Sequence, residues 1–157
     1  MSQEEFDGSK SRIRTVDEGE WLTANPGENF CIRVPATTTS GMYSVCEFIL
    51  SPGESGPLHY HAKEDQYVLV LEGTVRIVLG EKTIDAVPGQ SLAMMRGIPH
   101  GLGNATQEPV RYLSLSVPGG AEEALVIISN NPNMDHAGLL ELATRFDVTL
   151  VGPPILG

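Results

Sequence analysis

Short apolar runs broken by glycine and proline constrain this chain more than any other feature of its sequence. Of its 157 residues, 17 are glycine and 11 are proline. Turn signals stand at Pro52-Gly53, Glu72-Gly73, Gly80-Glu81 and Pro88-Gly89, with apolar runs between them. Runs too short for long helices, at such regular spacing, predict an all-β sandwich or barrel.

The expected strands end where the chain changes character, at Pro118-Gly119-Gly120. We expect strands over residues 29–37, 42–50, 67–71, 74–79, 83–86, 91–95 and 110–117. Two short helices should follow, over 121–129 and 135–146. In the second, Asp135 stands near the N-cap and apolar side chains recur at helical spacing, at Leu139, Leu142, Ala143 and Phe146.

One domain accounts for this length. We expect a flexible N-terminal tail over residues 1–15, a β-barrel over 16–118, and a C-terminal helical extension over 119–157 that packs on the barrel. Cys31 and Cys46 are the only cysteines, and we expect them to be reduced and buried, although the sequence alone leaves a bridge open.

Charge excludes several classes of partner. The chain carries 20 Asp and Glu against 10 Lys and Arg, a formal net charge of -10. Without a basic cluster, neither a nucleic acid nor an anionic membrane surface is expected to bind. No apolar run of about 18 residues and no secretory signal is found, so a cytoplasmic location is the default expectation.

The histidines are the first sign of chemistry. His59 and His61 follow Pro57 and lie two residues apart, so on an extended strand both side chains point to one face. Two imidazoles so placed can hold one metal ion. Taken alone, the pair favours two solvated loop histidines over a metal site.

Two longer patterns surround these histidines. In the first, five residues separate Gly53 from His59-Tyr60-His61, four more lead to Gln66 and six to Gly73. In the second, five residues separate Gly89 from Met95-Arg96-Gly97, two more lead to His100 and three to Asn104.

These patterns resemble the two motifs of the cupin superfamily, over about residues 29–117, and the C-terminal part is similar to that of small quercetinase-like single-domain cupins. The resemblance implies a jelly-roll β-barrel, usually a homodimer. It also implies one divalent transition metal held by residues of both motifs, His59, His61 and His100 with Gln66. The alternative is a barrel that keeps its histidines but no longer holds a metal.

The chain departs from the cupin pattern at two positions. Met95 stands where proline is usual, and Gln66 where the family has an acidic ligand. Asp65 would suit a shorter spacing, but the six residues to Gly73 favour Gln66, and Asp65 would face the other side of the strand. Three imidazoles and an amide leave the ion its double positive charge, which favours a bidentate anionic oxygen ligand. Fe, Mn, Ni, Co and Zn all suit such ligands.

Other candidate residues are weaker. Arg96 could meet an anionic substrate or simply face solvent, and Tyr112 is a pocket candidate on the last expected strand, as are Tyr43 and Tyr67 by composition alone. Together with Gln66, Arg96 and Tyr112 form the expected catalytic set. Asn104 is expected to face the pocket or to hydrogen-bond a turn, His136 to lie on the surface, and Glu64 to act as a base or lie on an exposed loop.

Three functions are open at this point, all with a small-molecule partner. The first is a metal-dependent dioxygenase acting on an oxygen-chelating substrate such as a flavonol, β-diketone or enol. The second is a lyase, isomerase, decarboxylase or cyclase that uses the ion only as a Lewis acid. The third is a small-molecule-binding barrel without turnover.

Overall fold

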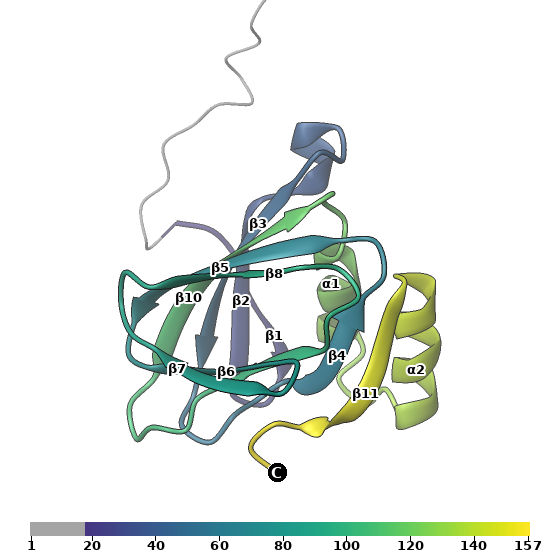
Figure 1. Cartoon of the computed structure of the whole chain (residues 1–157). Coiled ribbons are helices and arrows are strands. Elements are labelled where there is room, and N and C mark those ends of the chain that lie inside the picture. The colour runs from purple at the N-terminus through teal and green to yellow at the C-terminus, as the bar shows by residue number, and fades with distance from the viewer. Residues whose placement is uncertain (1–17) are drawn as a thin grey trace, which may run out of the picture.

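The computed structural model describes residues 18–157 as two antiparallel sheets that face each other (Figure 1). The six-stranded sheet has the order β1 (Trp21–Asn25), β2 (Glu28–Val34), β3 (Ser44–Leu50), β10 (Val110–Val117), β5 (Asp65–Glu72), β8 (Ser91–Met94). The five-stranded sheet has the order β11 (Val148–Pro154), β4 (Pro57–His61), β9 (His100–Gly103), β6 (Val75–Leu79), β7 (Lys82–Ala86). The all-β prediction is confirmed.

Strand alternation builds the core between the sheets. In β10, Val110, Tyr112, Ser114 and Ser116 are buried and alternate with more exposed neighbours. Across the sheet Tyr112 pairs with Phe48, and the two rings stack at 5.1 Å. Such period-two burial is what a strand with one face on a core requires.

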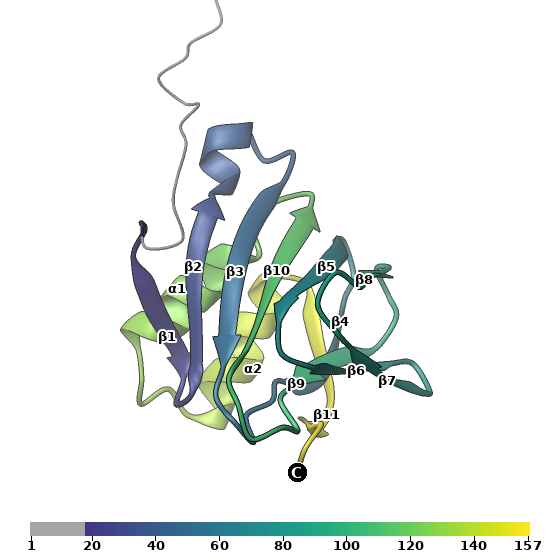
Figure 2. The same cartoon turned by 90° about the vertical axis from the view of Figure 1, so that its left-hand side faces the viewer.

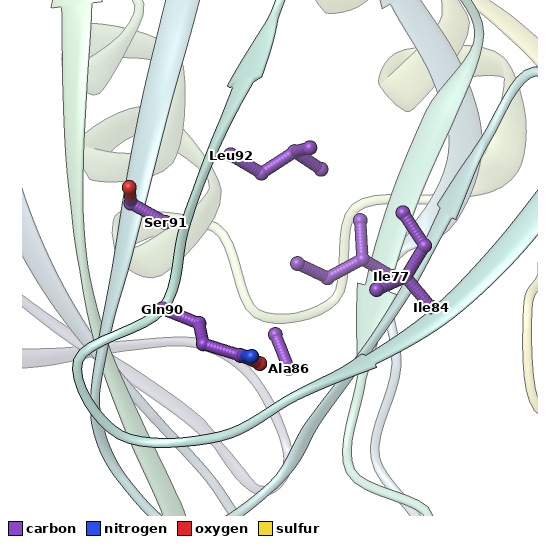
Figure 3. A pocket seen from close by; sticks show the side chains of 6 residues that line it. All are labelled: Ile77, Ile84, Ala86, Gln90, Ser91 and Leu92. Carbon is purple, nitrogen blue, oxygen red and sulfur yellow. The ribbon is translucent and has the colours of Figure 1, made fainter.

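The two sheets are not hydrogen-bonded into a closed barrel in the part of the chain that the structure describes. The six-stranded sheet ends at β8 and the five-stranded sheet at β7, and no pairing joins these edges. A cavity of about 270 Å³ lies at this seam, where Ile77, Ile84 and Leu92 point toward one another (Figure 3). The expected jelly roll is therefore open on one side.

The C-terminal residues contribute helices and one strand. Helices α1 (Glu122–Asn130) and α2 (His136–Arg145) start one residue later than expected, and Asp135 caps α2 by accepting from the Gly138 N–H. Leu125, Val126 and Ile128 of α1 pack on the core, and Figure 2 shows β1, β2, β3 and β10 in front of both helices. Strand β11 pairs with β4, the strand that carries His59 and His61.

Three further expectations can be compared with the structure. The tail over residues 1–15 lies outside the described residues. Cys31 and Cys46 are free and buried, and burial raises the pKa of Cys46 to about 12. Between residues 18 and 157, every helix falls short of the length and apolar character that a membrane crossing requires.

Candidate metal centre

Three histidines from two neighbouring strands meet on the inner face of the five-stranded sheet. His59 of β4 stands directly opposite His100 of β9, and His61 lies two residues further along β4. Their ring centroids are 4.6 to 5.5 Å apart, and one nitrogen from each ring lies within 4.8 Å of the other two. The two sequence patterns thus converge on one point.

Backbone carbonyls orient two of the rings. The Nδ1 atom of His59 lies 2.8 Å from the Pro57 oxygen, and that of His100 lies 3.0 Å from the Ile98 oxygen. Since a carbonyl can only accept, each Nδ1 donates its proton. The lone pair of Nε2 is then free to bind an ion.

A carboxylate stands behind the third ring. Oε2 of Glu64 lies 2.7 Å from Nδ1 of His61, and both residues are buried, at 9% and 7% exposed. The approach is too bent for an aligned hydrogen bond, so the contact is close but not collinear. His61 is therefore the one histidine of the three that faces a negative charge.

The donor set fits a transition metal. Nε2 of His61 and Nε2 of His100 are buried and have no hydrogen-bond partner, which is costly unless something binds there. Burial lowers the pKa of His59 to about 3, with a smaller contribution from His100, and it lowers the pKa of His100 to about 4. Both rings are thus neutral near pH 7, as a metal ligand must be.

Gln66 and Asp65 point to opposite faces of β5. Gln66 is on the same face as the buried Val68, and its Nε2 lies 3.4 Å from Ser116 Oγ. Asp65 instead accepts from the backbone and guanidinium of Arg96 at the surface. The inner face of β5 therefore presents an amide, and no carboxylate, at the position where the cupin pattern has its acid.

The other candidate residues make contacts of their own outside the histidine group. The Arg96 guanidinium is half exposed and paired with Asp65, and Tyr112 packs beside Phe48 in the other sheet. Asn104 is fully buried and bonds the turn: its Nδ2 donates to the Leu50 and Glu108 carbonyls. These positions follow from turn geometry and sheet register, which the spacing of the motifs does not specify.

Glu64 is the neighbour of the centre that sequence reasoning misplaced. The expected exposed position is wrong: Glu64 is buried against His61. Its spacing of three residues from His61, across a turn between two strands, was the available signal. The Pro57 and Ile98 carbonyls gave no signal, because any residue supplies one.

Comparisons with known proteins agree with this fold. The sequence model of the cupin domain matches residues 46–116. Mannose-1-phosphate guanylyltransferase 2 of Escherichia coli O157:H7 is 30% identical over 74 residues, which are 47% of this chain and 15% of that protein. The chain thus spans only a small part of this curated relative.

Two solved structures are similar in fold. A sugar phosphate isomerase from Silicibacter pomeroyi gives a TM-score of 0.61 at 22% identity, covering 68% of this chain and 75% of that one. The polyketide cyclase RemF from Streptomyces resistomycificus gives 0.58 at 23% identity, covering 68% and 78%. At these identities the likeness concerns the fold alone.

Proposed function

Because this chain is a small cupin-domain protein, we propose that it is a metal-dependent enzyme, and that its reaction is the dioxygenation of a small oxygen-chelating substrate. One observation carries the proposal: two buried histidine nitrogens without partners face a third histidine inside the fold. A protein without a ligand there would leave these atoms unsatisfied at a cost in stability.

Charge selects the class of substrate. The inward residues His59, His61, His100 and Gln66 are all neutral donors, so a divalent ion would keep its double positive charge. A substrate that offers two oxygens, one of them anionic, would complete this set best. Flavonols, β-diketones and other enolisable compounds have this chemistry.

The residues of the chain have separate tasks in this proposal. A bound divalent ion would supply Lewis-acid polarisation of the substrate oxygens. His59, His61 and His100 would hold it, while the amide of Gln66 either contacts it or hydrogen-bonds the substrate. Leu79, opposite His100, and Met94, opposite Gln66, present apolar walls. Such walls exclude water, which would reprotonate a deprotonated substrate, and they admit dioxygen.

A non-redox reaction on the same centre is the second candidate. The absence of a ligand carboxylate on β5 favours it, because a fully charged ion is the stronger Lewis acid. The structural neighbours named above, an isomerase and a cyclase, are consistent with such chemistry. A lyase, isomerase, decarboxylase or cyclase would act without consuming oxygen.

Metal content tests the first step of the proposal. Purified protein should contain close to one equivalent of a transition metal by elemental analysis, and a His59→Ala/His100→Ala variant should contain almost none. A His136→Ala variant, which removes a histidine outside the centre, should keep its metal. Less than about a tenth of an equivalent in the unmutated protein, even after incubation with Fe, Mn, Ni, Co or Zn, would contradict the proposal, since such sites bind tightly.

Oxygen consumption separates the two candidate reactions. The metal-loaded protein is incubated with a flavonol, a β-diketone and a hydroxy acid in an oxygen electrode, with the double histidine variant as control. Oxygen uptake matched to substrate loss supports the dioxygenase. Anaerobic turnover by the zinc-loaded protein supports the Lewis-acid reaction instead.

We also propose that the protein is a homodimer formed through the outer face of the six-stranded sheet. On that face Leu115 of β10 stands between Val45 of β3 and Tyr67 of β5. Tyr67 is 40% exposed, and no helix or strand within residues 18–157 covers this row. A second copy of the chain would bury it.

A further inference from the structure

We propose that Glu64 is the positioning residue of this centre: its carboxylate fixes the ring of His61 and supplies, from behind a ligand, the negative charge that Gln66 does not supply. The inference rests on the proposed metal centre. It concerns a residue outside the ligand set, and it explains how a neutral ligand set could still retain an ion.

The chain brings Glu64 to His61 by a tight reversal between β4 and β5. The first residue of this reversal, Ala62, donates its N–H to the Asp147 carbonyl at 2.9 Å, and Lys63 pairs with the Asp147 carboxylate at 2.8 Å. These contacts anchor the reversal to the C-terminal part of the chain. Glu64, the next residue, is thereby turned inward rather than left in solvent.

The burial of Glu64 has no other explanation among the described residues. In residues 18–157 the acids of the other ion pairs meet arginine or lysine, as Glu47 meets Arg33 and Asp65 meets Arg96. Glu64 meets only a histidine. A buried carboxylate with neither a cation nor an aligned donor is costly, and such costs concentrate where a group serves a site.

The three rings differ in what stands behind them. Behind His59 and His100 are neutral carbonyls, whereas behind His61 is an anion. A carboxylate accepts more strongly than a carbonyl, so it holds the Nδ1–H tautomer more firmly and makes Nε2 a better donor. When Nε2 binds an ion, the bent contact to Glu64 is expected to straighten.

This arrangement separates two effects that a ligand carboxylate combines. A carboxylate in the ligand set both neutralises the ion and occupies a coordination position. Glu64 attracts the ion only from behind the ring of His61, so the ligand set itself stays neutral and a position remains for a substrate oxygen. We therefore expect Glu64 to govern how tightly the ion is held, while leaving open the contact that an anionic chelating substrate needs.

The test compares Glu64→Gln, which removes the charge at nearly constant shape, with Asp65→Asn, which removes a neighbouring charge on the outer face. Zinc affinity is measured by competition with a chelator, after thermal unfolding has shown that both variants are folded. Glu64→Gln should bind zinc about 10 to 100 times more weakly than the wild type. Asp65→Asn should stay within about twofold, and Glu64→Asp, which keeps the charge with a shorter reach, should fall between.

A second measurement needs no metal. Nitrogen-15 NMR of the histidine rings reports which nitrogen carries the proton. In the wild type His61 should be in the Nδ1–H form, and Glu64→Gln should shift His61 toward a tautomer mixture while His59 and His100 keep theirs. Unchanged zinc affinity together with an unchanged tautomer in Glu64→Gln would overturn the inference. A wild type that binds no metal but shows the tautomer shift would overturn the proposed function and leave the role of Glu64 in place.

Discussion

At Gln66 an amide stands where a carboxylate would remove one unit of charge from a bound ion. Its side chain lies on the inner face of β5, so Gln66→Glu would place a carboxylate on that face, where the cupin pattern has its acid. We expect this variant to hold zinc at least tenfold more tightly, because a charged ligand replaces a neutral one. The same variant should bind an anionic flavonol more weakly. Chelator competition and flavonol titration measure the two effects, and parallel changes in both would contradict the charge argument.

The histidines also predict how stability depends on pH. Burial lowers the pKa of His59 to about 3 and of His100 to about 4, against 6.5 for the ordinary side chain. Between pH 6.5 and about 4 the unfolded chain binds protons that the folded chain does not. Stability of the metal-free protein should therefore fall as pH falls through this window, by about 1.4 kcal/mol per pH unit for each of these histidines.

Denaturant unfolding of metal-free protein at a series of pH values measures this slope. A His59→Gln/His100→Gln variant removes both groups and should flatten the dependence between pH 6.5 and 4. Zinc should steepen it, since protons then compete with the ion. A wild-type protein equally stable at pH 4.5 and 6.5 would show that these rings are not buried in the neutral form.

For individual strands, the local pattern of apolar runs and turn residues was enough to predict most of the bounds. Strand β10 has the bounds that its alternation gives, and β6 and β8 differ by one residue at one end. Strand β1 was not expected, because Trp21–Asn25 is only five residues long, and it is stabilised by pairing with β2. Strand β11 contains Gly152 and two prolines, which suit only an edge, and its partner β4 is distant in sequence.

In the candidate site, too, some features follow from local sequence pattern and others depend on contacts with distant residues. Strand parity was enough to place Gln66 inward and Asp65 outward, and motif spacing was enough to bring His59 and His100 together. The ring orientation of His61 depends on Glu64, whose position is set by a turn anchored at Asp147. A turn that is fixed by a residue as distant as Asp147 leaves no periodic trace in the sequence, so the short spacing between His61 and Glu64 was not enough to predict their contact.

The outer face of the six-stranded sheet contains a buried carboxylate that joins three strands. Glu47 of β3 is 4% exposed and pairs with Arg33 of β2 and Arg111 of β10. Glu47→Ala would leave both guanidinium groups without this partner. We expect the free energy of unfolding to fall by about 3 kcal/mol, as for other buried pairs that lose one member.

An exposed pair provides the control for this prediction. Asp85 of β7 pairs with Arg76 of β6 through two contacts of 2.8 and 2.9 Å, but in solvent. Asp85→Ala should cost much less, because water replaces the lost contacts. Urea unfolding of the two variants compares them directly, and equal losses would show that the Glu47 network does not tie the strands together.

Considered as a whole, the molecule divides its candidate centre between its two sheets. The three histidines lie on the five-stranded sheet, and Gln66 lies on the six-stranded sheet. The sheets are not hydrogen-bonded to each other at β7 and β8 in the described part of the chain, where the seam cavity lies (Figure 3). A change in sheet separation would therefore alter the distance of Gln66 from the histidines while leaving the histidine group intact.

The net charge of -10 bears on the proposed dimer. Two copies repel each other, and at an ionic strength of about 0.15 M that repulsion is screened beyond about 8 Å. If the row of Val45, Leu115 and Tyr67 is the interface, association should strengthen as salt rises from low to physiological concentration, since apolar contact provides the attraction. Leu115→Glu should give a monomer by light scattering, whereas Val151→Glu, at an exposed apolar position on β11, should leave the mass unchanged. A dimer that dissociates with added salt, or that survives Leu115→Glu, would place the interface elsewhere.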